Sequence, residues 1–318
     1  HRSAPALARL VRVIRPDLIY LNSFLDASFS VFPLLLRRAG IFDRSIEWLI
    51  APRGEFSPGA LAIKRRKKEL FLRVSHATGL HERMVWHAST EHEAEDIRRV
   101  MGRVAGEIRV AANPTASVDP LPPRPSRSAG APLSVCFLSR ISPKKNLLYA
   151  IDVVNRSRRP IHFVIYGPAE DAEYWRECQR VMSGVGAGSS IEWRGEVSPP
   201  QVRETLARHD VFLFPTRGEN FGHVIFEALA AGVPVLVSDR TPWLDLDARG
   251  SGWVRSLDDP QAFVDVLEAF ADATPQAREV ARRAAHAQAV EVSHSQAVLD
   301  ANRRLFLGPS PSGTGVLS

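Results

Sequence analysis

The 318-residue sequence is poor in cysteine and contains no long apolar run. Its two cysteines, Cys136 and Cys178, form no CxxC spacing, which argues against a disulfide framework and favours a reducing compartment with both thiols buried. No stretch approaches the roughly 18 consecutive apolar residues of a membrane-spanning helix, and no basic-then-apolar leader opens the chain. These absences predict a cytoplasmic protein without a membrane span.

Composition and length indicate a globular protein with more than one domain. Hydrophobic residues make up 45% and charged residues 24% of the sequence, so there is enough apolar surface for sizeable cores. At roughly 150 residues per domain, the length predicts about two domains.

Positive charge is concentrated in the first third of the chain. Residues 1–112 hold 19 Lys+Arg against 12 Asp+Glu, or +7, and residues 113–318 hold 22 against 23, or −1. The densest basic run consists of Lys64, Arg65, Arg66, Lys67 and Lys68. It is compatible with a solvated helix face, with an acidic acceptor, or with peripheral contact to an anionic membrane at the inner membrane face. Nucleic acid is not expected as a partner, because no aromatic interleaving accompanies the charge.

Helices and strands are expected to alternate along the first part of the chain. Apolar periodicity predicts helices at 4–14, 28–39, 59–74 and 91–102 and strands at 18–22, 46–51, 84–88 and 108–112. Thr90 followed by Glu93 has the spacing of a capping box and supports a helix start there. This alternation predicts a parallel sheet covered by helices on both faces.

A segment with six prolines, 113–132, interrupts the alternation and is interpreted as an interdomain linker. After it, strands are expected at 133–139, 161–166, 190–194, 211–215, 234–237 and 252–255, with helices at 146–157, 171–183, 199–208, 223–231, 259–271 and 275–306. The predicted fold is α/β, with two Rossmann-like doubly wound domains, 1–112 and 133–307, facing a cleft. A tail at 308–318 is expected to be disordered.

The stretch at 210–239 is the most informative of the sequence. It reads as a strand, a glycine-containing loop, a helix of small residues and a second strand. In an open α/β sheet such a loop lies where ligands bind, and the following helix directs its first amides at the ligand. Glu219 in the loop and Glu227 on the helix have seven residues between them. We therefore predict an anion site flanked by two carboxylates.

Two other strand ends carry residues suited to binding. After the strand at 133–139, Arg140 and Lys145 precede a helix that begins at Asn146, and a guanidinium and an ammonium group beside a helix start suit a diphosphate. After the strand at 161–166, Gly167 allows close backbone approach, although a simple turn explains it equally well.

Taken together, these motifs resemble the C-terminal domain of the retaining glycosyltransferases of family 4, which have the GT-B fold. The resemblance covers roughly 133–300 and rests on Arg140 with Lys145 and Asn146, Gly167, the loop Gly218-Glu219-Asn220-Phe221-Gly222-His223 with Glu227, and the segment Ala231-Gly232-Val233-Pro234-Val235. It implies that the second domain binds the diphosphate of a nucleotide-sugar donor, of UDP or GDP type, without a metal or other cofactor.

The resemblance also implies roles for single residues. Glu219 faces the donor sugar, Glu227 binds the ribose, and Arg140 and Lys145 bind the diphosphate. The other donor-binding positions it implies are Gly167, Asn220, Phe221, Gly222, His223 and Val224. Many relatives carry a histidine after the second strand of the first domain, where this chain has Arg53. Arg53 either adds charge near the leaving phosphate as a fourth catalytic residue, with Glu219, Arg140 and Lys145, or makes the site less effective.

The expected function is transfer of a sugar, with retention, to a saccharide or lipid-linked acceptor in bacterial polysaccharide synthesis. A complete relative has further βα units before the position of His1, so the first domain is expected to be truncated. Three alternatives stay open: a nucleotide-sugar-binding module or inactive subunit, another GT-B enzyme such as an epimerase or phosphorylase, and, more remotely, a structural protein.

Overall fold

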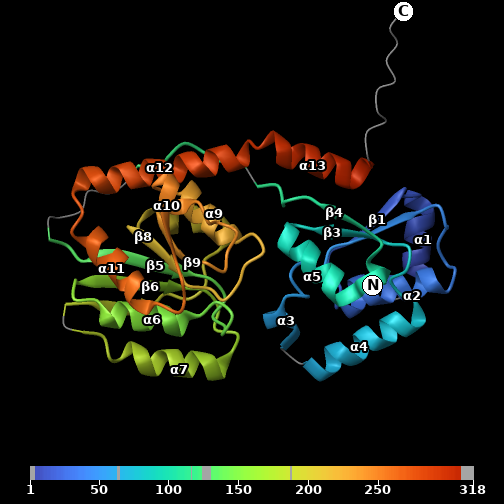
Figure 1. Cartoon of the computed structure of the whole chain (residues 1–318), viewed down its shortest axis with the longest axis horizontal. Coiled ribbons are helices and arrows are strands. Elements are labelled where there is room, and N and C mark those ends of the chain that lie inside the picture. The colour runs from blue at the N-terminus through green and yellow to red at the C-terminus, as the bar shows by residue number, and fades with distance from the viewer. Residues whose placement is uncertain (1–3, 63–64, 116, 124–129, 187, 309–318) are drawn as a thin grey trace, which may run out of the picture. The chain divides into compact units, whose positions relative to one another are not determined.

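The computed structural model describes residues 4–62, 65–115, 117–123, 130–186 and 188–308. The chain divides into two compact units (Figure 1). Unit 1 comprises His1–Pro114 and Gln296–Ser318, and unit 2 comprises Thr115–Ser295. Each unit is an α/β layer structure built on its own parallel sheet, as the alternating pattern predicts. The tail expected to be disordered lies, from residue 309 on, outside the described residues.

Unit 1 is built on a four-stranded sheet with the order β1-β2-β3-β4. All three strand pairings are parallel. Its strands are β1 (Leu18–Leu21), β2 (Glu47–Ile50), β3 (Val85–Ala88) and β4 (Glu107–Val110), and its helices are α1 (Ala4–Ile14), the π-helical turn η1 (Ala27–Val31), α2 (Phe32–Arg38), α3 (Pro58–Ala62), α4 (Arg65–Thr78), α5 (Glu91–Met101), the 3-10 helix η2 (Gly102–Ala105) and α13 (Gln296–Leu307). Phe24, Phe56 and Trp86, all buried, form the centre of its core.

Unit 2 is built on a six-stranded sheet with the order β10-β9-β8-β5-β6-β7. Its strands are β5 (Leu133–Leu138), β6 (Ile161–Tyr166), β7 (Ser190–Trp193), β8 (Val211–Phe214), β9 (Val235–Ser238) and β10 (Gly252–Arg255), and its helices are α6 (Leu147–Arg156), α7 (Ala172–Met182), the 3-10 helix η3 (Pro199–Gln201), α8 (Val202–Ala207), α9 (His223–Ala230), α10 (Leu246–Arg249), α11 (Pro260–Ala271) and α12 (Pro275–Ser293). The strand order is that of the doubly wound dinucleotide fold. In this fold the order in which strands are added to the sheet reverses between the first and fourth strands, here the parallel neighbours β5 and β8.

The C-terminal helix differs from the prediction in two ways. A single helix was expected at 275–306, but α12 ends at Ser293 and α13 begins at Gln296. The Ser293 hydroxyl donates to Val290 O at 2.8 Å, a local bond that competes with helix continuation. In addition, α13 belongs to unit 1 and not to the second domain as bounded at 133–307. Leu305 is buried against that unit, and Asn302 donates to Ala112 O at 2.8 Å.

The proline-rich segment is more than a spacer in its described part. Arg203 donates to Asp119 O at 3.0 Å, and the ring nitrogen Nε2 of His286 also lies 3.0 Å from that oxygen. Arg282 donates to Pro122 O. Residues 117–123 are therefore fastened to unit 2 by side chains that satisfy their backbone carbonyls, which proline-rich chain cannot pair within itself.

Candidate functional site

The loops that follow β5 and β8 meet at the point where the strand order of unit 2 reverses. β5 and β8 are neighbours in the sheet, where Val135 pairs with Val211, although these two residues are 76 positions apart along the chain. In open α/β sheets, ligands bind in the crevice at the carboxyl ends of the strands at this reversal. The predicted site residues Lys145 and Glu219 lie in these two loops.

Lys145 and Glu219 form the central contact of the site. Lys145 Nζ lies 2.6 Å from Glu219 Oε1, and the two side chains are 16% and 12% exposed. The same ammonium lies 5.4 Å from the centroid of the Phe214 ring at the end of β8. Partial burial strengthens the attraction, because water screens the charges less than at the surface. The structure thus brings together a cation and an anion that the sequence separates by 74 positions.

The loop that carries Glu219 is fastened by residues that the sequence analysis did not single out. Thr216 is buried, and its hydroxyl lies 3.0 Å from Glu219 Oε1 and 3.2 Å from Lys144 O. The buried Ser238 hydroxyl donates to Thr216 O at 2.5 Å. These hydroxyls hold the β8 loop against the β5 loop and so fix the position of Glu219. No sequence motif marks them, because their partners are distant along the chain.

Lys144 is a further cation that the sequence analysis did not select. Burial lowers its pKa, and Glu219, Lys145 and Arg140 are the charged groups that act on it. Only the first of these three neighbours favours the charged form. The site therefore contains three basic side chains, of which Lys145 pairs with Glu219 and Arg140 with Glu170, and this excess of positive charge suits an anionic ligand.

Arg140 lies in a more open position than Lys145. Its Nη1 is 3.6 Å from Glu170 Oε2, and the two side chains are 66% and 56% exposed. An ion pair this exposed contributes little to stability. Arg140 is therefore free to turn toward a ligand, but the structure does not hold it in place.

Glycine and asparagine residues let the site loops take conformations that other residues would resist. Asn146 precedes α6 in the left-handed region, with φ 61°, and its amide donates to Pro215 O at 2.9 Å. Gly167 has φ 129°, and a Cβ there would lie 1.9 Å from Ser139 O. Gly167 is thus required for the backbone after β6 to approach the β5 loop, which is a structural reason for this residue.

The start of α9 carries the remaining predicted donor-binding residues. Gly222 is the N-cap with φ 78°, and the Phe221 ring packs edge-on against Trp243 with centroids 5.5 Å apart. Trp243 Nε1 donates to Phe221 O at 2.6 Å. His223 is exposed, whereas Asn220 and Val224 are partly buried. Trp243 therefore acts as a packing residue that fixes the turn into the helix.

Glu227 lies on α9, one turn after its start, and is half-buried. Burial raises the pKa of its carboxyl group. The described residues provide its side chain with no hydrogen-bond or ion-pair partner. A carboxylate in this state gains from a ligand that donates hydrogen bonds to it.

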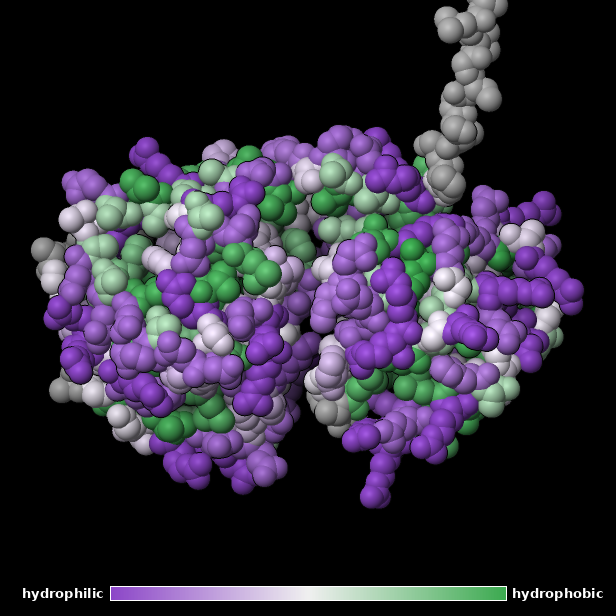
Figure 2. Space-filling model, in the orientation of Figure 1, coloured by the Kyte–Doolittle hydropathy of each residue, from purple (hydrophilic) through white to green (hydrophobic). Residues whose placement is uncertain are grey.

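Other predicted features lie outside this site. Arg53 belongs to unit 1, where its side chain bonds Tyr20, Asn22 and Asn113. In the basic run, Lys64 lies outside the described residues, Arg65 pairs with Glu69 at 2.6 Å, and Lys68 donates to Ala60 O. Figure 2 shows a largely hydrophilic surface over the start of α4. The run therefore presents fewer free charges than its sequence suggests.

The predicted capping box forms only in part, and both cysteines are buried as predicted. Thr90 accepts from Glu93 N at 3.1 Å, as predicted, but the Glu93 carboxylate reaches Ser89 N at 2.8 Å and not the N-cap amide. Cys136 and Cys178 are both free and buried, as predicted.

Two surface hollows lie away from the predicted site. One is lined by residues of β10 and α11, and the other lies beside α4.

The described residues contain neither a metal-binding cluster nor a membrane-spanning helix. No group of three or more His, Cys, Asp or Glu residues there is arranged to hold a metal ion. No helix in the same part of the chain is long and apolar enough to cross a membrane.

Curated relatives of the chain are glycosyltransferases. It is 29% identical over 221 residues to a D-inositol 3-phosphate glycosyltransferase of Streptomyces avermitilis, which covers 63% of this chain and 47% of the relative. It is 26% identical over 191 residues to a putative colanic acid biosynthesis glycosyltransferase, WcaL, of Escherichia coli, with 58% and 46% covered. The chain thus spans about half the length of the curated relatives it matches.

Solved structures show the same fold. Anabaena HepE in complex with UDP and glucose superposes with a TM-score of 0.70 at 19% identity, over 95% of this chain and 80% of that chain. Sucrose-phosphate synthase from Thermosynechococcus elongatus superposes with a TM-score of 0.71 at 18% identity, over 96% and 78%. Residues 132–272 match the family described as Glycosyl transferases group 1. Over this segment the chain is therefore similar to the group 1 glycosyltransferases, and its fold is the GT-B fold.

Proposed function

We propose that the protein transfers a sugar, with retention of configuration, from a nucleotide-diphosphate donor of UDP or GDP type to a saccharide or lipid-linked acceptor in bacterial polysaccharide synthesis. The observation that carries the proposal is the Lys145–Glu219 pair at the strand-order reversal of unit 2. HepE, whose fold the chain shares, was crystallised with UDP-glucose, which supports a donor of this class.

The donor diphosphate would bind among the basic side chains of the β5 loop. Lys145 and Arg140 supply positive charge, and Lys144 adds a third cation close by. The first amides of α9 supply further donors, since the first turn of a helix leaves N–H groups without intrahelical partners. We propose that these groups, and no metal ion, neutralise the charge that develops on the leaving diphosphate.

The two carboxylates would bind neutral parts of the donor. Glu227, half-buried and without a partner among the described residues, accepts hydrogen bonds from the ribose hydroxyls. Glu219 accepts hydrogen bonds from hydroxyls of the donor sugar once the diphosphate draws Lys145 away from it. Thr216 keeps the Glu219 carboxylate in place during this exchange of partners.

Donor binding and product stereochemistry test the proposal. Calorimetric titration with UDP, GDP and their glucose conjugates should show saturable binding of one nucleotide class, and Glu227→Ala should weaken binding of the nucleotide more than binding of pyrophosphate. With the accepted donor and a saccharide acceptor, proton NMR of the product should show the donor's anomeric configuration. Inverted product would refute retention, and absence of any nucleotide binding would refute the donor site.

Binding without transfer to any acceptor would instead favour a nucleotide-sugar-binding module.

The basic run carries a separate proposal. We propose that Arg65, Arg66 and Lys67, which are all exposed, make peripheral contact with an anionic membrane. At low salt the protein should co-sediment with phosphatidylglycerol vesicles and should not co-sediment with neutral phosphatidylcholine vesicles. Equal retention by both kinds of vesicle would refute this contact.

A further inference from the structure

A second cluster of polar side chains lies at the carboxyl ends of the strands of unit 1. Tyr20 is on β1, Asn22 follows β1, Arg53 follows β2, His87 is on β3 and Asn113 follows β4. All four strands are parallel, so these residues share one edge of the sheet. This is the edge at which ligands bind in open α/β sheets.

Hydrogen bonds fix the direction of every contact in the cluster. His87 Nε2 lies 2.8 Å from Ala111 O, which can only accept, so this nitrogen carries the proton and Nδ1 is an acceptor. The Tyr20 hydroxyl, 2.8 Å from His87 Nδ1, therefore donates to it. Burial lowers the pKa of His87, which supports the neutral ring. The oxygen of Tyr20 is thus left to accept from Arg53 Nη2 at 2.7 Å.

Arg53 is held only by neutral acceptors. Besides the Tyr20 oxygen, its guanidinium donates from Nε to Asn22 Oδ1 at 2.6 Å and from Nη1 to Asn113 Oδ1. A guanidinium has five N–H groups, so one on each terminal nitrogen has no partner among the described residues. No carboxylate there forms an ion pair with Arg53. By contrast, Lys145 and Arg140, the predicted catalytic cations of unit 2, each have a carboxylate partner.

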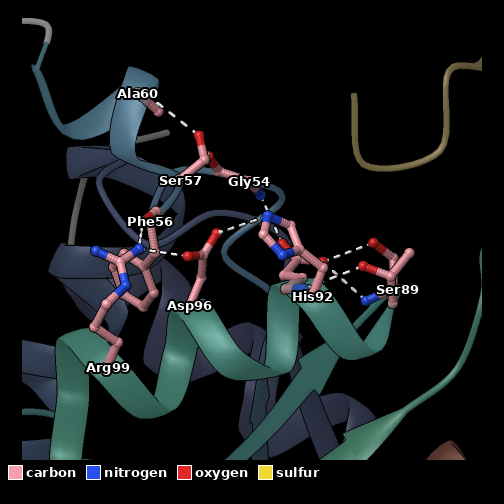
Figure 3. Close-up of polar contacts among 10 residues, drawn as sticks. Gly54, Phe56, Ser57, Ala60, Ser89, His92, Asp96 and Arg99 are labelled. Atoms are coloured by element: carbon pink, nitrogen blue, oxygen red, sulfur yellow. Dashed lines mark hydrogen bonds and ion pairs between the residues drawn. The ribbon is translucent and has the colours of Figure 1, made fainter. Parts of the chain in front are cut away.

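The backbone around Arg53 is held in place as well. Arg53 has φ 54°, a left-handed backbone conformation that residues other than glycine rarely adopt. The next residue, Gly54, donates its N–H to the buried Glu93 at 2.6 Å. Figure 3 shows Gly54 and Ser89 next to the first turn of α5, where Ser89 N and Oγ also donate to Glu93. Glu93 accepts from these donors and forms no ion pair with Arg53 among the described residues, although its charge acts on Tyr20 and His87.

We propose that Arg53 is a preformed binding site for an oxyanion, a phosphate or carboxylate group, of one of the protein's sugar substrates. A guanidinium with two free N–H groups matches two oxygens of such a group, and its orientation is fixed before the ligand arrives. Tyr20, Asn22 and Asn113 are positioning residues that direct the guanidinium. We assign the oxyanion to the acceptor.

Phosphate binding tests the site without reference to transfer. In a protein carrying Arg140→Gln and Lys145→Gln, which removes two cations of unit 2, inorganic phosphate is titrated and followed by calorimetry. Adding Arg53→Gln should weaken phosphate binding at least about tenfold, the effect of losing hydrogen bonds to a charged group. The matched control is Arg83→Gln, because Arg83 is exposed and also has a left-handed backbone, with φ 55°. Equal binding by the Arg53 and Arg83 variants would overturn the proposal.

Two further measurements test the positioning role of Tyr20 and the source of the oxyanion. Tyr20→Phe keeps the Arg53 charge and should weaken phosphate binding by only a fewfold, and it should leave the circular dichroism unchanged. In the otherwise wild-type protein, Arg53→Gln should leave the affinity for UDP unchanged, and a loss of UDP affinity would overturn the assignment of the oxyanion to the acceptor. Only the UDP measurement rests on the proposed function, so failure of UDP to bind at all leaves the phosphate result intact.

Discussion

Cations at the strand ends are held differently in the two units. In unit 2, Lys145 is paired with Glu219 at 2.6 Å and Arg140 with Glu170 at 3.6 Å. In unit 1, Arg53 is surrounded by a phenol and two amides and has no carboxylate partner among the described residues. A paired cation must exchange one anion for another when a ligand binds, whereas an unpaired cation gains an anion. We therefore expect ligand binding to be coupled to a rearrangement in unit 2 and not in unit 1.

Removing the paired cation should have the largest effect. Lys145→Ala takes away charge from the proposed diphosphate site and leaves Glu219 partly buried without its partner. We expect donor turnover, as kcat/KM, to fall by about a hundredfold to a thousandfold, as for other losses of one transition-state donor. Steady-state kinetics measure this effect. Arg83→Ala, which removes an exposed cation of unit 1 outside the basic run, is the control, and a loss of similar size in that variant would show that net charge and not the pair is responsible.

The two units should also differ in their response to acid. His81 is buried in unit 1, and burial lowers its pKa from 6.5 to about 4. Because the unfolded chain takes up this proton at higher pH than the folded chain, the free energy of unfolding should fall as pH drops from about 6.5 to 4, by about 3 kcal/mol in total. In unit 2, burial raises the pKa of Glu227, which has the opposite sign: its effect favours the folded state as the pH falls.

Urea unfolding at several pH values tests this difference. As the pH is lowered, the urea midpoint reported by a fluorescence or proteolysis signal from unit 1 should fall more than the midpoint reported from unit 2. In His81→Leu the pH slope between 6.5 and 4 should become shallower, whatever the change in stability at pH 7. An unchanged slope would show that His81 does not control the acid response.

The smallest expected effect concerns the partner of Lys145. Glu219→Gln keeps the shape of the side chain but frees the ammonium group from its ion pair. We expect UDP to bind about fivefold more tightly, which corresponds to about 1 kcal/mol for a partly buried pair, while sugar transfer decreases. Calorimetry gives the affinity, and Glu170→Gln is the control, since its exposed pair with Arg140 should change UDP affinity by less than about twofold. Weaker UDP binding in Glu219→Gln would contradict the idea that the pair competes with the ligand.

Local sequence patterns predicted the elements and the loops that carry the candidate site. Apolar runs placed the ends of β5 and β8 within one residue, and the residues that follow a strand end are the ones exposed at the edge of a sheet. This is why Lys145 and Glu219 were selected. By contrast, Lys144, Thr216, Ser238 and His87 were missed, because each has its role through a partner far away in the chain and the pattern around it is that of an ordinary loop or strand.

The sequence by itself determined the α/β class, the parallel sheets and the site loops, since hydrophobic periodicity and turn residues act over a few positions. The tertiary structure decided which loops meet. Only the strand order places β8 beside β5 and brings Glu219 to Lys145, and only the packing of unit 1 gathers Tyr20, Asn22 and Asn113 around Arg53. Contacts between distant positions depend on how whole strands and helices bury their apolar faces, and no local pattern encodes that arrangement.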